Sequence, residues 1–289
     1  MTLPNFLVVG ANRAGTTAMH SFLAEHPDIY MSGLKEPSFF ALFGQRPDAT
    51  LRDSAFFSNQ MVHTLEAYEA LFSEAGGHKA IGESSTAYLP HPHVPTRIKS
   101  HLPAVRVIAI LRDPADRAFS NYSLYRQLGL ERANTFRKSL VPPPAWTHDP
   151  NGFGDRYVSR GFYASAVQRY HETFGRERVR IYLYEDWTTR PRDVLKDVFR
   201  FLEIDDSFVP DVSPRLNEAS RSPLLASVLH RLGPPNAKGD PPRFVGFLRR
   251  LNRRQLLPAD RRMLVDVYRE DVIALQTLID RDLSAWLCS

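Results

Sequence analysis

The most constraining feature of this sequence is its start, where a short apolar run is followed by two glycines and then by a helical pattern. Residues Phe6 to Val9 predict a buried strand, and the loop with Gly10 and Gly15 leads into a helix that extends to about His26. The first turn of a helix leaves backbone N–H groups unpaired, and the helix dipole favours negative charge there. This order of strand, glycine loop and helix therefore predicts a binding site for a phosphate or sulfate group.

The glycine spacing of the loop is that of a Walker A loop, but Thr16 stands where the Walker lysine belongs. Nucleoside triphosphatases use that lysine to reach the β and γ phosphates. Because the lysine is replaced, we expect the loop to bind a different anion. A P-loop kinase-like phosphotransferase stays open as the alternative, since it shares the strand, the loop and the helix.

Four segments follow one another in the first two thirds of the chain: GANRAGTT, KEPSFF, GESSTAYL and VIAILRDPADRAFSNY. Together they resemble the signatures of sulfotransferases that use 3′-phosphoadenosine 5′-phosphosulfate (PAPS), in the branch with the heparan sulfate and bacterial enzymes. The resemblance implies an α/β, P-loop-like three-layer fold, with a central mainly parallel sheet flanked by helices and a helical C-terminal extension. We expect one sulfotransferase domain over residues 1–289, with the PAPS-binding α/β core in 1–205 and the helical part in 206–289.

The resemblance places the PAPS site on two segments and a later loop. The backbone amides from Ala14 through Gly15 and Thr16 to Thr17, with the two threonine hydroxyls, would hold the 5′-phosphosulfate. Arg112 and Ser120 would hold the 3′-phosphate, and a guanidinium suits it because it donates two parallel charge-assisted hydrogen bonds. Arg221 is the candidate from a basic loop that closes over the nucleotide. These assignments, with Arg13, form the predicted cofactor site: Arg13, Ala14, Gly15, Thr16, Thr17, Arg112, Ser120 and Arg221.

Arg112 follows the clearest predicted strand, Val105 to Leu111, and precedes a predicted helix that extends to about Gln127. Asp113 is a favourable N-cap residue and Pro114 a favourable first helical residue. On the residues alone, Arg112 is also compatible with capping the sheet edge or pairing with Asp116.

The predicted catalytic residues are Glu36, Arg13 and Lys35. Pro37 disfavours helix at the preceding position, so Lys35 and Glu36 are expected in a loop, and the resemblance makes Glu36 the general base for the acceptor. The family usually has lysine where this chain has Arg13, and arginine does not give up its proton. We therefore expect Arg13 to stabilise the leaving group by charge alone, and we hypothesise that Lys35 shares this role.

Glu83 matches a second carboxylate of the family and is the predicted acceptor-binding residue; a helix cap or a surface carboxylate is the alternative. Ser84 follows it where related carbohydrate enzymes often have lysine. The acceptor itself stays open between sugars, glycosylated metabolites, lipids and phenols, and its reacting group is a hydroxyl or an amine.

The formal net charge of +5 fits an anionic co-substrate, and equally an acidic partner. The arginine-rich stretch from Arg243 to Leu257 leaves a non-catalytic polyanion-binding protein as a further alternative. Cys288 is the only cysteine, which excludes an internal disulfide, and His91 and His93 have no third ligand nearby, so we expect no metal. Without a signal-peptide pattern or a long apolar run, we expect a cytoplasmic, bacterial-type enzyme with no membrane insertion and no nucleic-acid partner.

Overall fold

The computed structural model describes residues 2–42, 62–140, 157–212 and 256–288, and its centre is a five-stranded parallel sheet. The strand order is β2 (Ile29–Met31), β3 (Ala80–Ser84), β1 (Phe6–Gly10), β4 (Arg106–Leu111) and β5 (Val179–Leu183). Every strand pairing is parallel. Strands β1 and β3 are buried along their whole length, which explains their continuous apolar pattern. The predicted α/β fold with a central parallel sheet is confirmed.

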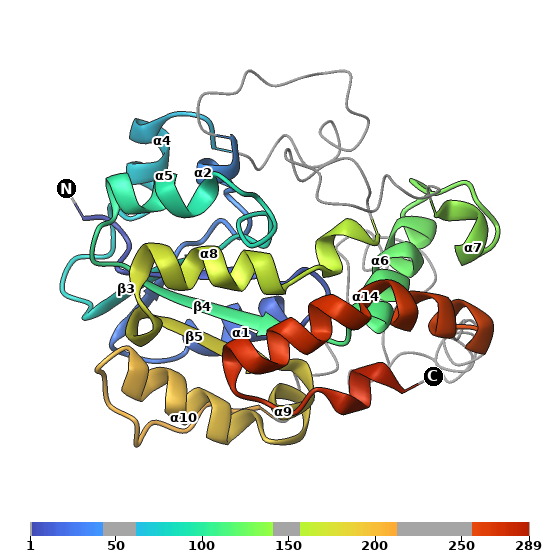
Figure 1. Ribbon diagram of the computed structural model, residues 1–289. Coiled ribbons are helices and arrows are strands. Elements are labelled where there is room, and N and C mark those ends of the chain that lie inside the picture. The colour runs from blue at the N-terminus through green and yellow to red at the C-terminus, as the bar shows by residue number, and fades with distance from the viewer. Residues whose placement is uncertain (1, 43–61, 141–156, 213–255, 289) are drawn as a thin grey trace, which may run out of the picture.

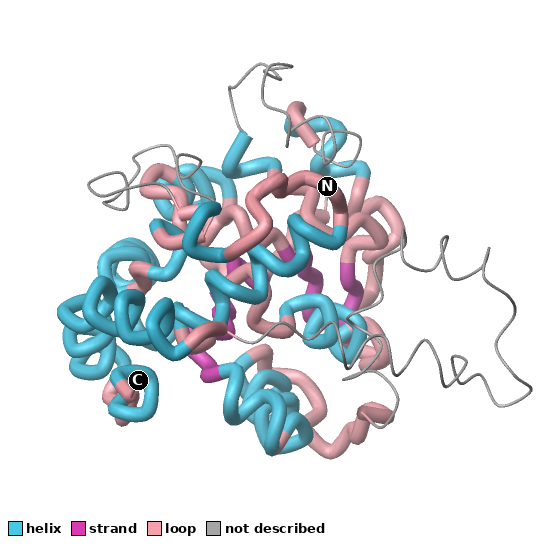
Figure 2. Tube along the Cα trace, turned by 90° about the vertical axis from the view of Figure 1, so that its right-hand side faces the viewer, coloured by secondary structure: helices cyan, strands magenta, loops and turns pink. Residues whose placement is uncertain are grey.

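Helices cover both faces of this sheet, so the core has three layers (Figures 1 and 2). On one face α1 (Thr16–Leu23) contacts β1, β2 and β3, and ring contacts of Phe22 with Trp187 and of His26 with Phe199 join α9 and α10 to it. On the other face α8 (Ala164–Phe174) packs between α5 (Val94–His101) and α14 (Pro258–Ile279). The remaining helices are α2 (Phe39–Leu42), α4 (Leu65–Ala70), α6 (Pro114–Gln127), α7 (Phe136–Ser139), α9 (Tyr184–Thr189) and α10 (Pro191–Phe201), with 3-10 turns at Ser159–Gly161, Arg176–Arg178 and Ser284–Leu287.

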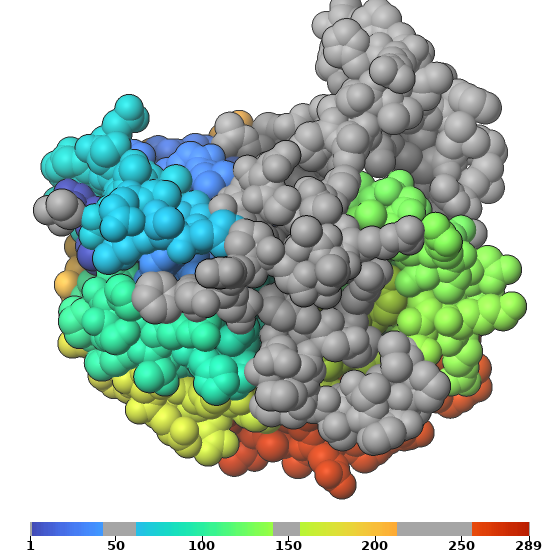
Figure 3. Space-filling view, turned by 90° about the horizontal axis from the view of Figure 1, so that it is seen from above, coloured from blue at the N-terminus to red at the C-terminus, as the bar shows by residue number. Residues whose placement is uncertain are grey.

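Seen from above, α4 and α5 lie on one side of the molecule and α6 and α7 on the other (Figure 3). The C-terminal helix α14 packs against α8 and α6, and the hydroxyl of Tyr268 donates to the carbonyl oxygen of Val158 at 2.8 Å. The last helical part of the chain is therefore docked on the α/β core.

The predicted helix α6 begins where its capping signals place it. The Asp113 carboxylate accepts hydrogen bonds from the N–H groups of Ala115 and Asp116 at 2.8 and 3.0 Å, and Pro114 is the first helical residue. These bonds satisfy donors that the first turn of a helix leaves unpaired.

One predicted boundary differs from the structure. The first helix ends at Leu23 instead of His26, because the His26 ring caps the following turn by accepting from the N–H of Asp28 at 3.0 Å. The short helix α7 begins after its cap Thr135, whose hydroxyl oxygen accepts from the N–H of Lys138. Helix α8 begins at Ala164, and the N–H groups of Tyr163 and Ala164 donate to the Asp271 carboxylate.

Two predictions concern residues outside the described ranges: Arg221, and positions 243–255 of the arginine-rich stretch. Among the helices that the structure describes, none has both the length and the apolar character needed to cross a membrane.

Candidate active site

The predicted residues of the strand-end turns lie at the carboxyl edge of the sheet. The turn after β1 carries Arg13, the turn after β2 carries Lys35 and Glu36, and Arg112 follows β4 directly. Ligands bind at this edge in open parallel α/β sheets, since the strand ends and the helix N-termini meet there.

The predicted anion cradle lies in the turn after β1 and the start of helix α1. No described group accepts a hydrogen bond from the backbone N–H of Gly15, Thr16 or Thr17, which begin helix α1. Thr16 is buried whereas the Thr17 side chain is exposed. Gly15 has a φ of 88°, and a β-carbon on it would lie 2.7 Å from Nε1 of Trp187. The loop thus requires glycine both for its backbone conformation and for its packing.

Two arginine side chains converge beside this cradle. Nε of Arg13 donates to Oγ of Ser120 at 3.1 Å, and Nη1 of Arg112 donates to the carbonyl oxygen of Arg13 at 3.0 Å. The Arg112 guanidinium lies 4.5 Å from the centre of the Tyr184 ring. Burial, and then the charge of Arg112, lower the pKa of Arg13. Within the described ranges neither guanidinium pairs with a carboxylate, so an anion would relieve the repulsion between them.

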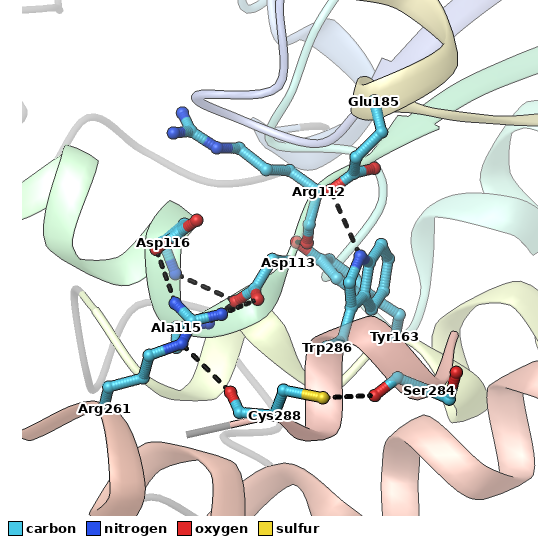
Figure 4. A network of polar contacts seen from close by, with 10 residues as sticks. All are labelled: Arg112, Asp113, Ala115, Asp116, Tyr163, Glu185, Arg261, Ser284, Trp286 and Cys288. Atoms are coloured by element: carbon cyan, nitrogen blue, oxygen red, sulfur yellow. Dashed lines mark hydrogen bonds and ion pairs between the residues drawn. The ribbon is translucent and has the colours of Figure 1, made fainter. Parts of the chain in front are cut away.

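The acidic residues next to Arg112 are bound by another cation. Arg261 of α14 places Nη2 2.5 Å from Oδ2 of Asp113 and Nη1 2.8 Å from Oδ1 of Asp116 (Figure 4). The Arg112 side chain points away from both aspartates in the same view. The alternative pairing of Arg112 with Asp116 is therefore not formed, and Arg112 stays available at the cradle.

The C-terminal end of the chain braces this turn. Nε of Arg261 also donates to the carbonyl oxygen of Cys288 at 3.1 Å, and Nε1 of Trp286 donates to Oε1 of Glu185 at 3.1 Å (Figure 4). From the core, the buried hydroxyl of Tyr163 donates to the carbonyl oxygen of Arg112 at 3.1 Å. Sequence reasoning did not find Arg261, because it lies 148 positions from its partner Asp113.

The Glu36 carboxylate is held by the turn after β3. Oε2 accepts from the N–H of Thr86 at 2.7 Å, and the Thr86 hydroxyl lies 3.1 and 3.2 Å from the two carboxylate oxygens. Nζ of Lys35 lies 2.7 Å from Oε1. The Glu36 side chain keeps 34% of its surface exposed, so the carboxylate is oriented and still reachable.

The backbone around Glu36 is strained. Glu36 has a φ of 64° and Ser38 a φ of 55°, although neither is glycine. Such left-handed residues each cost roughly 1–3 kcal/mol and persist where the surroundings fix them. Strained backbone of this kind concentrates at functional sites, which fits the predicted role of Glu36.

The remaining predicted residues have the following places. Lys35 contacts Glu36, and no described contact joins it to the cradle, so its role toward the leaving group stays a prediction. Glu83 is fully buried within β3, which is neither a helix cap nor a surface position. Burial is the main cause that raises its pKa to about 7, while hydrogen bonds from Ser85 and Tyr88 oppose it. A direct acceptor contact would require this buried group to become accessible.

His20 of α1 is a further residue of this region that sequence reasoning did not single out. Its Nδ1 lies 3.1 Å from Oγ of Ser84. Burial, and then the charge of Lys35, lower the pKa of His20 to about 4, so its ring is neutral at pH 7. The one signal in the sequence was its position: His20 lies about one helical turn after the glycine loop, which places it near this edge of the sheet. Among the described residues, no group of three histidine, cysteine or acidic side chains could hold a metal.

Comparisons with known proteins indicate the family. The sequence matches the family described as "Sulfotransferase domain" over residues 3–219. It is 28% identical over 207 residues to bifunctional heparan sulfate N-deacetylase/N-sulfotransferase 4 of Mus musculus, and 26% identical over 219 residues to the Drosophila melanogaster enzyme of the same description. Both alignments cover 70% of this chain, but only 22% and 20% of the two relatives, so the chain spans about a fifth of their length.

Among solved structures, the chain resembles a sulfotransferase from Alicyclobacillus acidocaldarius. The two are 30% identical, with a TM-score of 0.76, and the match covers 99% of each chain. This match therefore also covers chain beyond residue 219, where the family match ends.

Proposed function

Because the chain belongs to the sulfotransferase domain family, we propose that it transfers the sulfuryl group of PAPS to a hydroxyl or amine of a carbohydrate or small-molecule acceptor. The observation that carries this proposal is the pair of guanidiniums, Arg13 and Arg112, beside the unpaired N–H groups at the start of α1. In the reaction the bond from sulfur to the bridging oxygen breaks and a bond to the acceptor forms. Adenosine 3′,5′-bisphosphate leaves, and the acceptor loses its proton.

The cradle and Arg112 bind opposite ends of the nucleotide. The N–H groups of Gly15, Thr16 and Thr17 bind the 5′-phosphosulfate, since unpaired helix N-terminal donors suit an anion. The Ala14 N–H of the predicted set already donates to the carbonyl oxygen of Ala11 at 3.2 Å. Arg112 binds the 3′-phosphate, because only one of its donors is committed to the Arg13 carbonyl oxygen. The Ser120 hydroxyl accepts from Arg13, which leaves its own hydrogen free to donate to the same phosphate.

Glu36 is the general base. Its carboxylate is partly exposed, and the Thr86 N–H and the Lys35 ammonium fix its direction. Arg13 stabilises the charge that develops on the leaving bisphosphate, and Lys35 is retained as a hypothesis for the same role. Arg221 remains the proposed residue for closing over the nucleotide.

The acceptor class is supported by the relatives. Their names describe N-sulfotransferases of heparan sulfate, so an amine or hydroxyl on a sugar is the first acceptor to test here. The cytoplasmic location, the bacterial type, the single-domain organisation and the absence of a nucleic-acid partner stay predictions.

The first experiment is calorimetric titration of the protein with adenosine 3′,5′-bisphosphate and, separately, with ATP and Mg²⁺. We expect the bisphosphate to bind, the Arg112→Ala variant to lose at least about 30-fold in affinity, and Arg192→Ala, an exposed arginine on α10, to match the wild type. Preference for ATP would overturn the proposal in favour of a phosphotransferase. Binding of neither nucleotide would overturn it in favour of a non-catalytic polyanion-binding protein.

The second experiment measures transfer itself. Release of adenosine 3′,5′-bisphosphate from PAPS is followed with an N-deacetylated heparosan oligosaccharide, which presents both free amines and hydroxyls. We expect turnover that depends on this acceptor, and loss of about 100-fold or more in a Glu36→Gln variant that still binds the bisphosphate. A Glu36→Gln variant with wild-type turnover would show that Glu36 is not the base.

A further inference from the structure

Glu83 is a fully buried carboxylate that the proposed reaction does not use. It lies on β3 opposite Leu7 of β1, at the centre of the sheet. Its Oε1 accepts from the hydroxyl of Tyr68 at 3.3 Å, and its Oε2 accepts from Oγ of Ser85 at 2.8 Å. Burying a carboxylate is unfavourable unless it is hydrogen-bonded, and an apolar residue would serve packing better. The contacts of Glu83 therefore point to a role beyond the core.

Ser85 connects this carboxylate to the turn that carries Glu36. While its hydroxyl donates to Glu83, Oγ accepts from the backbone N–H of Ser38 at 2.9 Å. The Ser38 hydroxyl in turn donates to the carbonyl oxygen of Glu36 at 3.2 Å. Two hydrogen bonds through Ser85 thus join the buried carboxylate to the backbone of Ser38, and the Ser38 side chain contacts the backbone of the proposed base.

The turn from Glu36 to Ser38 needs such support. Both residues have left-handed backbone on either side of Pro37, a conformation that non-glycine residues keep only where neighbours fix it. The last residue of β3 and the two residues after it bind the turn at three places. The Ser84 carbonyl oxygen accepts from the N–H of Glu36 at 2.9 Å, Ser85 accepts from Ser38, and Thr86 donates to the Glu36 carboxylate.

We infer that Glu83 is a positioning residue for Glu36: through Ser85 it fixes the turn that places the Glu36 carboxylate on Thr86. A serine hydroxyl has one hydrogen to donate and can point it in several directions. Accepting that hydrogen, Glu83 turns the lone pairs of Ser85 toward the Ser38 N–H. The inference rests on the proposed function, in which Glu36 takes the proton of the acceptor.

Two substitutions break the connection through Ser85 and two others serve as controls. Ser85→Ala removes the bridge, and Glu83→Leu removes the group that orients it. Glu83→Gln is the conservative variant, because its amide oxygen still accepts from Ser85. Tyr68→Phe is the matched control, because it deletes the hydrogen bond to the other oxygen of the same carboxylate and leaves the bridge intact.

With PAPS and the oligosaccharide acceptor, we expect kcat to fall about tenfold or more in Ser85→Ala and Glu83→Leu. The dissociation constant of adenosine 3′,5′-bisphosphate should stay within about twofold of the wild type, since the cradle is built from other segments. Glu83→Gln and Tyr68→Phe should keep kcat within about threefold. In a Glu36→Gln background, Ser85→Ala should cause no further loss, because the bridge acts through Glu36.

A second measurement needs no acceptor and covers the case in which Glu83→Leu does not fold. The amide signal of Thr86 in a ¹H–¹⁵N correlation spectrum reports its hydrogen bond to Glu36. We expect Ser85→Ala to move this signal toward its position in Glu36→Gln, and Tyr68→Phe to leave it unchanged.

The positioning role is overturned if Thr86 does not respond to Ser85→Ala, or if Ser85→Ala keeps wild-type kcat while Glu36→Gln is inactive. Failure of the proposed base looks different. In that case Glu36→Gln itself keeps full turnover, whereas the Thr86 signal still shows whether Ser85 holds the turn.

Discussion

Arg112 donates a hydrogen bond from Nη1 to the carbonyl oxygen of Arg13 at 3.0 Å, and this bond joins the turn after β4 to the turn after β1. The two residues are 99 positions apart in the chain. Their side chains carry like charges in a partly buried place, so the bond fixes two cations close together without neutralising either. Binding of an anion stabilises two like charges held this close together. A bisphosphate nucleotide offers one phosphate to each of the two arginines.

Two substitutions of Arg13 distinguish the effect of its charge from the effect of its hydrogen bond at the leaving group. We expect Arg13→Ala to lower kcat about 100-fold, because the developing charge on the bisphosphate loses its partner. Arg13→Lys keeps the charge, gives up the hydrogen bond from Nε to Ser120, and should retain kcat within about tenfold. Steady-state kinetics with PAPS measure both variants. Equal losses in the two would mean that the bond to Ser120, and not the charge, is what the reaction needs.

Lys35 offers a direct test of the hypothesis about the leaving group. Its ammonium lies 2.7 Å from the Glu36 carboxylate, so Lys35→Met should lower kcat about tenfold or more, while Lys35→Arg keeps most of the turnover. Rates of bisphosphate release from PAPS measure the effect. Unchanged turnover in Lys35→Met would exclude Lys35 from both the leaving-group role and the orientation of the base.

Much of the fold could be predicted because its signals are local. Strand β1 is apolar throughout, as both of its faces are buried, and α6 begins at the residue whose carboxylate accepts from its first turn. The pairing of the glycine loop with Arg112 was predicted from the four motifs. The structure places these segments at one edge because the strands β1 and β4 are neighbours in the sheet.

The support for the site could not be predicted, since it depends on contacts between distant segments. The Glu36 carboxylate bonds Thr86, 50 positions later, and nothing in the local sequence of either residue indicates this contact. Likewise Arg261 reaches Asp113 from the last long helix. Burial of Glu83 was missed because glutamates are mostly exposed, and only the tertiary fold encloses this one.

The ion pairs of Arg261 predict a stability difference between two arginines on helix α14. Arg261 contacts the buried Asp113 with a side-chain exposure of 24%, whereas Arg269 pairs with Asp266 at exposures of 49% and 72%. We expect Arg261→Met to lower the free energy of unfolding by about 1–3 kcal/mol, because it leaves a buried carboxylate without its partner. Arg269→Met should change it by less than about 0.5 kcal/mol.

Urea unfolding at neutral pH measures the stability of both variants. Titration with adenosine 3′,5′-bisphosphate shows whether the ion pairs of Arg261 also affect ligand binding by Arg112. We expect Arg261→Met to weaken binding of the bisphosphate several-fold and Arg269→Met to leave this affinity unchanged. Similar stability losses in both variants would mean that the contact with the buried Asp113 stabilises the fold no more than the exposed ion pair of Arg269 does.

Glu83 predicts a pH dependence of stability. Its pKa rises from 4.5 to about 7 on folding, chiefly by burial, so the folded state binds a proton more tightly than the unfolded state. The free energy of unfolding should therefore fall as pH rises from about 4.5 to 7, by an amount on the order of 3 kcal/mol from this group. Below that window both states are protonated, and Glu83 adds no pH dependence.

Burial also raises the pKa of Asp271, to about 6, so the test compares the pH dependence of two proteins. Urea unfolding of wild type and Glu83→Gln at pH 5 and pH 8 isolates the contribution of Glu83. We expect Glu83→Gln to gain stability relative to the wild type as pH rises between these values. A constant difference at both pH values would show that Glu83 keeps an ordinary pKa in the folded protein.

Three glycines with different surroundings test how the anion cradle is built. Gly15 combines a φ of 88° with a β-carbon position 2.7 Å from the Trp187 ring, Gly129 has a φ of 72° in open space, and Gly33 is in open space without positive φ. We expect Gly33→Ala to be nearly neutral, Gly129→Ala to lower the free energy of unfolding by about 1 kcal/mol, and Gly15→Ala by roughly 3 kcal/mol. Gly15→Ala should also weaken bisphosphate binding, because a shifted Trp187 or loop would misalign the N–H donors of α1. Equal effects of Gly15→Ala and Gly129→Ala would mean that Trp187 moves freely and that only the backbone conformation demands glycine.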